Sequence, residues 1–292
     1  PGDYTVGWIC ALPIELAAAQ VMLDEEDDGP SQNSFDSTPY TLGRIGDHNV
    51  VLACLPAGQI GTHSAATAAT RMTSKFTSIR IGLMVGIGGG VPSADTDIRH
   101  GDVVISQPHQ QHGGVVQYDF RKTGAGGHKT RTGWLNAPPD VLLNAVSNLR
   151  ALHLRDRNNL ATYLSAFNQL KNFSRNTAGP DVLFEATYNH IKGATCEQCN
   201  KEKVVKRTPR KGQEMVIHYG TIASGNQVIK DGVSRDRLST ELGGVMCFEM
   251  EAAGLMNAFP CLVIRGICDY TDCSTKCEGI LYRQRTPSTT RL

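Results

Sequence analysis

Residues 247–272 read CFEMEAAGLMNAFPCLVIRGICDYTD, and this stretch decides the fold class. Two acidic residues, Glu249 and Glu251, precede a short helical turn that a proline ends. The apolar run Cys261–Cys268 then predicts a buried strand, and Asp269 follows it directly. Ligands of open α/β sheets bind outside the carboxyl ends of the strands. We therefore expect these three acids to surround a small molecule.

Strands and helices alternate along the rest of the chain, which predicts an α/β fold. Buried strands are expected at Tyr4–Cys10, Tyr40–Ile45, Val50–Leu55, Arg80–Ile87, Val103–Ser106, Gly113–Phe120 and Val216–Ala223. Helices are expected to begin at Pro13 and to cover Thr62–Phe76, Pro138–Leu152 and Asp181–His190.

Composition narrows the class of protein. The 292 residues carry a net charge of +1, which gives no general attraction to nucleic acid or to membranes. Nine cysteines lie scattered, mostly inside apolar runs, as in reduced cytoplasmic proteins. No signal peptide precedes Tyr4, and no apolar run reaches eighteen residues. The chain begins with Pro rather than Met, so we expect it to be a piece of a longer protein.

One pair of cysteines has a spacing seen in metal sites. Cys196 and Cys199 form half of a zinc-binding pattern, but no second Cys/His pair stands nearby in sequence. Two thiols are the favoured interpretation over structural zinc. We expect no metal and no cofactor.

The motifs FEMEAAG and LVIRGICD resemble the nucleoside phosphorylase and methylthioadenosine nucleosidase superfamily, from about Tyr4 to Asp272. The resemblance is strongest to a fungal branch found at the N-terminus of NACHT, ankyrin or TPR proteins, and some relatives in immune proteins cleave ATP. It implies a three-layer α/β/α fold with a central mixed β-sheet. It also implies one catalytic domain over 1–272, with an insertion at about 156–214, and a homo-oligomer.

The resemblance assigns roles to three acids. Asp269 would donate a proton to the leaving purine, Glu251 would bind the ribose hydroxyls as an ionised acceptor, and Glu15 would activate water. From chemistry alone, Glu15 is equally well a carboxylate favoured by a helix N-terminus. Asp269 must be protonated near neutral pH, so we expect burial to raise its pKa.

The same resemblance implies a substrate pocket. The segment Ser224–Ile229 is similar to Ser-Gly-Asp-x-Phe-Ile of adenine-cleaving hydrolases, whose last two residues read the purine through their main chain. Asn226 replaces the Asp of that motif. The full set of expected substrate-binding residues is Glu251, Met250, Glu249, Phe248, Val228, Ile229, Asn226, Gly88 and Gly89.

Hydrolysis is favoured over phosphorolysis by two departures from the phosphorylase pattern. Phosphorylases carry a phosphate-binding Arg in the first βα loop, and Ala11–Val21 contains none. They also carry Arg-x-Gly-Ser after the central strand, where Met84 and Ile87 stand here. An apolar pair cannot bind a dianion.

Phosphate contacts from the substrate side are expected at Arg121, Lys122 and Lys230. The first two lie with Lys129 and Arg131 in a basic, glycine-rich loop. Cationic side chains pair with phosphate oxygens, so this loop is a candidate clamp for a nucleotide 5′ phosphate. A solvated basic loop without function is an equal alternative.

These observations lead to three hypotheses. The first is a purine N-glycosidase that releases adenine from a nucleoside or nucleotide, with ATP as a candidate substrate of an immune-type effector. The second is a phosphate-dependent phosphorylase. The third is a catalytically silent sensor domain of a larger NLR-like protein. After Asp272 the resemblance fails, and the tail 273–292 is either disordered or reflects an error in the gene model.

Overall fold

The computed structural model describes residues 2–28, 38–127, 129–155, 157, 160–173, 180–189, 191, 196, 198–210 and 215–272. The tail 273–292 and His190 lie outside these residues. The strands are β1 (Val6–Cys10), β2 (Glu25–Asp27), β3 (Tyr40–Ile45), β4 (His48–Cys54), β5 (Ile81–Gly90), β6 (Val103–Ser106), β7 (Val115–Gln117), β8 (Arg121–Thr123), β9 (Lys129–Arg131), β10 (Ile217–Gly220), β11 (Ile222–Ser224), β12 (Cys247–Glu249) and β13 (Cys261–Asp269). The α-helices are α1 (Pro13–Val21), α2 (Thr62–Lys75), α3 (Asp140–Leu154), α4 (Leu160–Ser165) and α5 (Gly232–Glu241).

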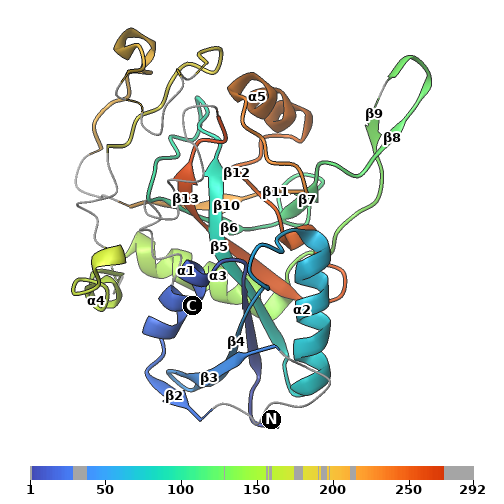
Figure 1. Ribbon diagram of the computed structural model, residues 1–292, viewed down its shortest axis with the longest axis vertical. Helices are drawn as coiled ribbons and strands as arrows, with labels where there is room; N and C mark the ends of the chain where they lie inside the picture. The colour runs from blue at the N-terminus through green and yellow to red at the C-terminus, as the bar shows by residue number, and fades with distance from the viewer. Residues whose placement is uncertain are drawn as a thin grey trace.

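A mixed β-sheet forms the centre of the molecule, in the order β10-β6-β13-β5-β1-β4-β3-β2 (Figure 1). Strand β5 is its axis because it pairs in parallel with both β1 and β13. The last residues of β5, Gly89 and Gly90, also pair with β12. Strand β5 therefore brings together the ends of β12 and β13, which carry the acids singled out in the sequence.

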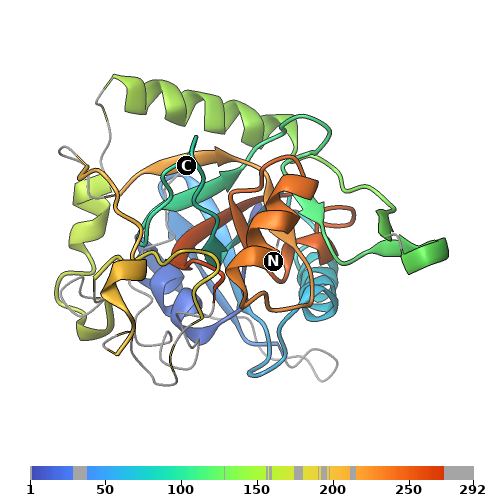
Figure 2. The same ribbon diagram turned by 90° about the horizontal axis from the view of Figure 1, so that it is seen from above.

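Helices cover both faces of this sheet. Helix α2 packs its small side chains and Met72 against one face, in a core that includes Ile9 and Val263. Helices α1 and α3 pack against the opposite face, where Trp8 lies in the second core. Figure 1 shows α1 and α2 on opposite sides of the strands, and Figure 2 shows α3 lying across the top of the sheet. The expected three-layer α/β/α fold is confirmed.

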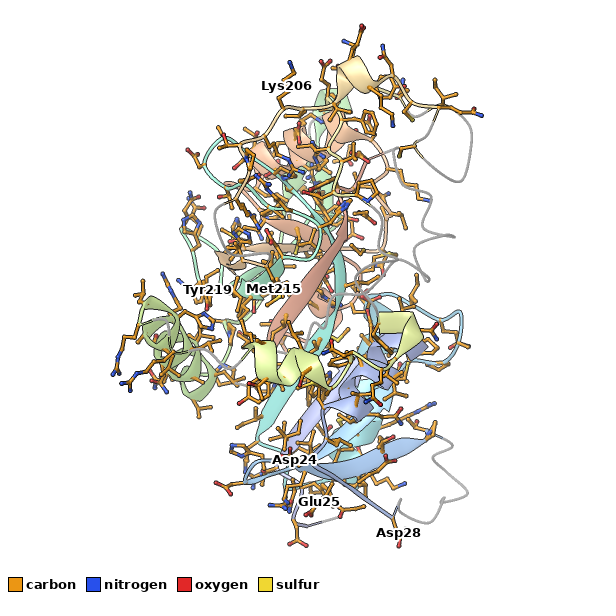
Figure 3. The ribbon with its side chains drawn as sticks, turned by 90° about the vertical axis from the view of Figure 1, so that its left-hand side faces the viewer. Asp24, Glu25, Asp28, Lys206, Met215 and Tyr219 are labelled. Carbon is orange, nitrogen blue, oxygen red and sulfur yellow. The ribbon has the colours of Figure 1, made fainter. Side chains whose placement is uncertain are left out.

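The second core continues to the β10 edge of the sheet. Met215 and Tyr219, labelled in Figure 3, pack against it. The guanidinium of Arg150 on α3 lies 4.9 Å from the centre of the Tyr219 ring. Figure 3 also shows that the acidic residues Asp24, Glu25 and Asp28 lie at the opposite end of the molecule from Lys206.

Two expected elements differ from the structure. The helix expected at Asp181–His190 is wrong, because residues 181–189 contain no helix. Their backbone pairs instead with a distant segment, and the N–H of Val205 donates to Leu183 O at 2.8 Å. The expected strand Val216–Ala223 is two strands, β10 and β11, which pair with different neighbours. A segment's own periodicity does not show which partner its backbone will find.

A buried carboxylate fastens the segment around residue 210 to the sheet. Asp102, which is fully buried, accepts both terminal nitrogens of Arg210 at 2.6 and 2.7 Å and the His218 ring at 2.9 Å. Burial alone would raise the pKa of Asp102, but these hydrogen bonds lower it to about 2. The folded pKa lies below the unfolded one, so the contribution of Asp102 to stability is present above about pH 4 and is lost as the pH falls toward 2.

We expect Asp102→Asn to lower the free energy of unfolding by about 3 kcal/mol at pH 7, because the variant replaces a fully buried carboxylate and leaves the half-buried Arg210 against a neutral partner. Urea denaturation measures this loss. The matched control is Asp97→Asn, whose side chain is 45 % exposed although it also contacts Arg210, and which should cost less than about 1 kcal/mol. Equal losses for the two variants would contradict the assigned role.

Candidate functional site

A cavity of about 340 Å³ opens at the ends of β5, β12 and β13. Five acids line it, namely Glu15, Glu249, Glu251, Asp269 and Asp272. Its other walls include the predicted residues Gly88, Gly89, Val228, Ile229, Phe248 and Met250. The structure therefore brings together most residues that the sequence singled out, from segments as far apart in the chain as those of Glu15 and Asp269.

Glu15 enters the cavity from the first turn of α1. Its carboxylate is buried and accepts the N–H groups of Ala11 at 2.7 Å, Leu12 at 2.9 Å and Ile87 at 2.9 Å. Burial raises the pKa of Glu15, while Arg265 and these three donors lower it. Glu15 is both a carboxylate at a helix N-terminus and part of the cavity wall, so the two interpretations of this residue are compatible.

Arg265 holds Glu249, at the end of β12, and Glu251, just after that strand, in place. This arginine lies in the middle of β13 and is fully buried. Its Nη2 forms a very short hydrogen bond with Glu249 and lies 3.6 Å from Glu251 Oε2. Glu249 also accepts the backbone N–H groups of Glu251 at 3.0 Å and Ala252 at 3.0 Å. Glu249 is therefore occupied by protein groups and fixes the position of Glu251.

The surroundings of Glu251 have opposing effects on its pKa. Its Oε1 accepts the N–H of Gly61, just before α2, at 3.2 Å. Burial, opposed by Arg265 and assisted by Glu249 and Glu15, raises the pKa of Glu251 to about 7. We expected Glu251 to be ionised. With this pKa, the carboxylate is fully ionised only above neutral pH.

Asp269 sits at the last position of β13. Burial raises the pKa of Asp269, and the Thr271 N–H, which donates to its Oδ1 at 2.8 Å, offsets part of this rise. The His100 ring is close enough for its charge to favour the ionised carboxylate, but burial lowers the pKa of His100 and favours its neutral form. The direction of the Asp269 shift is the one that a proton donor needs.

Glycines make room around Asp269. A Cβ atom added to Gly89 would lie 2.6 Å from Asp269 Oδ1 and 2.0 Å from Thr271 Oγ1. A Cβ on Gly88 would lie 3.0 Å from Phe248 O. Any larger residue at Gly89 would displace the carboxyl group, so the glycine run at the end of β5 serves close approach between strands.

Three predicted residues lie away from the cavity. Asn226 caps α2 instead, because its Oδ1 accepts Thr62 N at 3.0 Å where Gly61 offers no side chain. Arg121 lies on β8 and pairs with Glu241 at 3.1 Å, and neither Arg121 nor Lys122 lines the cavity. Lys230 does line it and is the single cation among its described lining residues. The position of the β8–β9 arm, which projects from the body in Figure 1, accounts for this difference.

Sequence reasoning missed Arg265, Thr271 and His100. The sequence did contain one signal for Arg265, because it is a charged residue inside an apolar strand. A charged side chain that is buried in such a strand must be paired with other groups. The other two depend on contacts between distant segments. Among the described residues, no group of three or more His, Cys, Asp or Glu side chains is arranged to hold a metal ion, and no helix has the length and apolar character needed to cross a membrane.

Comparison with known families agrees with this arrangement. The family model described as the phosphorylase superfamily matches residues 5–279. The chain belongs to the phosphorylase superfamily.

Relatives within this superfamily include enzymes and a larger protein. The chain is 49 % identical over 276 residues to a nucleotide-binding leucine-rich repeat (NLR)-like protein of Hyaloscypha variabilis, covering 93 % of this chain and 27 % of that protein. It is 29 % identical to a 5′-methylthioadenosine/S-adenosylhomocysteine nucleosidase of Mycobacterium bovis, covering 91 % and 85 %. It is 26 % identical to the ATP nucleosidase Cap17 of Escherichia coli, covering 92 % and 46 %.

A solved structure supports the superfamily fold. The 5′-methylthioadenosine/S-adenosylhomocysteine nucleosidase of S. pneumoniae superposes with a TM-score of 0.56 at 18 % identity, covering 95 % of this chain and 90 % of that one. The chain thus spans one superfamily domain and about a quarter of the length of its NLR-like relative.

We expect Arg265→Met to lower the free energy of unfolding by about 3–5 kcal/mol at pH 8, because three buried carboxyl groups lose their counter-charge. The loss should shrink at pH 5.5, where the raised pKa of Glu251, about 7, lets this group stay protonated. Urea denaturation at both pH values measures it.

The control for this variant is Arg44→Met, which removes a surface ion pair with Glu25. That variant should cost less than about 1 kcal/mol at either pH. A loss for Arg265→Met that does not depend on pH would show that packing, rather than charge compensation, is the role of Arg265.

Proposed function

We propose that the chain hydrolyses the N-glycosidic bond of an adenine nucleoside or nucleotide. One observation carries the proposal: a single cavity is lined by Glu15, Glu251 and Asp269, and burial raises the pKa of Asp269. The nucleosidase names of two relatives support the same chemistry. A phosphorylase is the alternative within the superfamily.

The three acids divide the work of the reaction. Protonated Asp269 gives its proton to the leaving base, which departs neutral while positive charge develops on the sugar. Glu251 accepts hydrogen bonds from the ribose hydroxyls and stabilises that charge. Glu15 takes a proton from the attacking water, and its raised pKa makes it a stronger base than an exposed carboxylate. The products are the free base and ribose or its phosphate.

Water, rather than phosphate, is the nucleophile that the cavity favours. Met84 is fully buried in the core and does not line the cavity, and Ile87 lines it with an apolar side chain. None of the described residues that line the cavity is an arginine. A phosphate dianion would face five carboxyl groups with Lys230 as its single cationic partner.

The size of the cavity sets the position of any 5′ phosphates. A volume of about 340 Å³ suits a nucleoside, and the chain of a triphosphate would extend past the exposed rim residues Ile60 and Val228. Lys230, which lines the cavity, is the cation proposed to bind these phosphates. The ATP nucleosidase among the relatives supports a nucleotide substrate.

The biological setting follows from the relatives. Because the NLR-like relative is much longer than the matched region, we propose that this domain is the effector part of a longer, oligomeric NLR-like protein. The buried thiols of Cys10, Cys247 and Cys261 form no disulfides, which supports a reducing, cytoplasmic location.

Adenine release from ATP, adenosine and methylthioadenosine, followed by chromatography, tests the reaction. We expect release without phosphate, and a loss of at least about 100-fold in Asp269→Asn. The rate should fall as the pH rises through the raised pKa of Asp269. The same variant should melt at a higher temperature at pH 8, since ionising a buried Asp269 destabilises the folded state.

Asp140→Asn is the matched control, since this exposed aspartate begins α3 outside the cavity. It should leave the rate unchanged. Release that requires phosphate would favour the phosphorylase, and no release from any substrate by a folded protein would favour the silent sensor domain.

Lys230→Met tests the position of the phosphates. We expect kcat/KM for ATP to fall about tenfold, because one charge-assisted contact is lost, while kcat/KM for adenosine stays unchanged. Lys122→Met is the control, since Lys122 does not line the cavity. A larger effect of Lys122→Met than of Lys230→Met would return the phosphate site to the β8–β9 arm.

A further inference from the structure

Thr271 stands two residues after the proton donor and lines the same cavity. It is 6 % exposed and has φ of +53°. A β-branched residue rarely adopts this left-handed conformation, and such outliers gather at functional sites. The surrounding protein enforces it, because Arg235 donates to Tyr270 O at 2.8 Å and the Tyr270 hydroxyl is bound by Asp181.

The hydroxyl of Thr271 has no protein partner. Its Oγ1 is buried and makes no hydrogen bond within the described part of the chain. Most buried polar atoms are hydrogen-bonded, so this exception needs a reason. A hydroxyl can both donate and accept, and Thr271 belongs to the residues that line the cavity, where a ligand could supply the missing partner.

The Thr271 hydroxyl lies close to the carboxyl group of Asp269, the proposed proton donor. A Cβ on Gly89 would lie within 2.6 Å of both Thr271 Oγ1 and Asp269 Oδ1, so the two oxygens stand over the same glycine. The backbone N–H of Thr271 binds that Oδ1, which leaves the hydroxyl beside it for a different atom. On a purine, the ring nitrogen N7 and the group on C6 are neighbours along one edge.

We propose that Thr271 reads the base: its hydroxyl hydrogen-bonds the 6-substituent of a purine while Asp269 protonates the adjacent ring nitrogen. This inference rests on the proposed function and names a specificity-determining contact within the same site. The 6-amino group of adenine would donate an N–H hydrogen bond to Thr271 Oγ1. The threonine thereby orients the base for the proton that its neighbour delivers.

Binding of free bases tests this contact without turnover. Calorimetry would compare adenine with unsubstituted purine on the wild type, Thr271→Val and Thr271→Ser. The quantity compared is the ratio of the Kd of unsubstituted purine to the Kd of adenine, which measures the contribution of the 6-amino group. This ratio should be about five- to tenfold larger for the wild type and Thr271→Ser than for Thr271→Val. Thr271→Val keeps the shape of the side chain, and its melting temperature should not fall, because the hydroxyl has no protein partner in the unliganded protein.

The outcomes separate this inference from the proposed function. If the wild type binds adenine but the 6-amino group contributes the same to the affinity of all three proteins, the Thr271 contact is overturned and the proposed function stands. If Thr271→Val melts well below the wild type, the hydroxyl is structural and the inference fails. If the wild type binds neither base, the proposed function fails and takes the inference with it.

Discussion

The buried guanidinium of Arg265 is the interaction on which the candidate site depends. Carboxyl groups from three segments, Glu15, Glu249 and Glu251, lie close enough to share its charge. Without it, their mutual repulsion and the cost of burial would keep them protonated or drive them apart. The backbone is adapted to this cluster as well. A Cβ on Gly86 would lie 2.3 Å from Arg265 Nη1 and 2.5 Å from Glu15 Oε1, so β5 must carry a glycine there.

The same cavity separates two kinds of acid. Burial raises the pKa of Glu251 to about 7, while Arg265 and the N–H of Gly61 oppose this rise and favour its ionised form. Burial also raises the pKa of Asp269 and favours its protonated form. Glycosidic cleavage needs one group that gives a proton and others that bear charge. Arg265 supplies a counter-charge to Glu251 and thereby contributes to this difference.

The sequence showed the strands and the acids better than their surroundings. Apolar runs located the sheet, and the strand Val103–Ser106 has the expected bounds. Resemblance supplied Asp269, Glu251 and Glu15. The contacts of Arg265 and the orphaned hydroxyl of Thr271 depend on residues brought together only by folding. The helix expected at Asp181–His190 failed for the same reason, because residues 203–205 take its backbone hydrogen bonds. Periodicity describes one segment at a time, whereas these features belong to pairs of segments.

Tyr270, which stands between Asp269 and Thr271, connects the cavity wall to residues from a distant part of the chain. Asp269 and Thr271 line the cavity, whereas Tyr270 makes its contacts outside it. Its ring stacks on His100 at 4.2 Å and lies 5.3 Å from the Arg207 guanidinium, and Asp181 binds its hydroxyl. Asp181 and Arg207 pair at 2.7 Å. Asp181 and Arg207, which lie between α3 and β10 in the chain, therefore hold the residue that joins Asp269 to the strained Thr271.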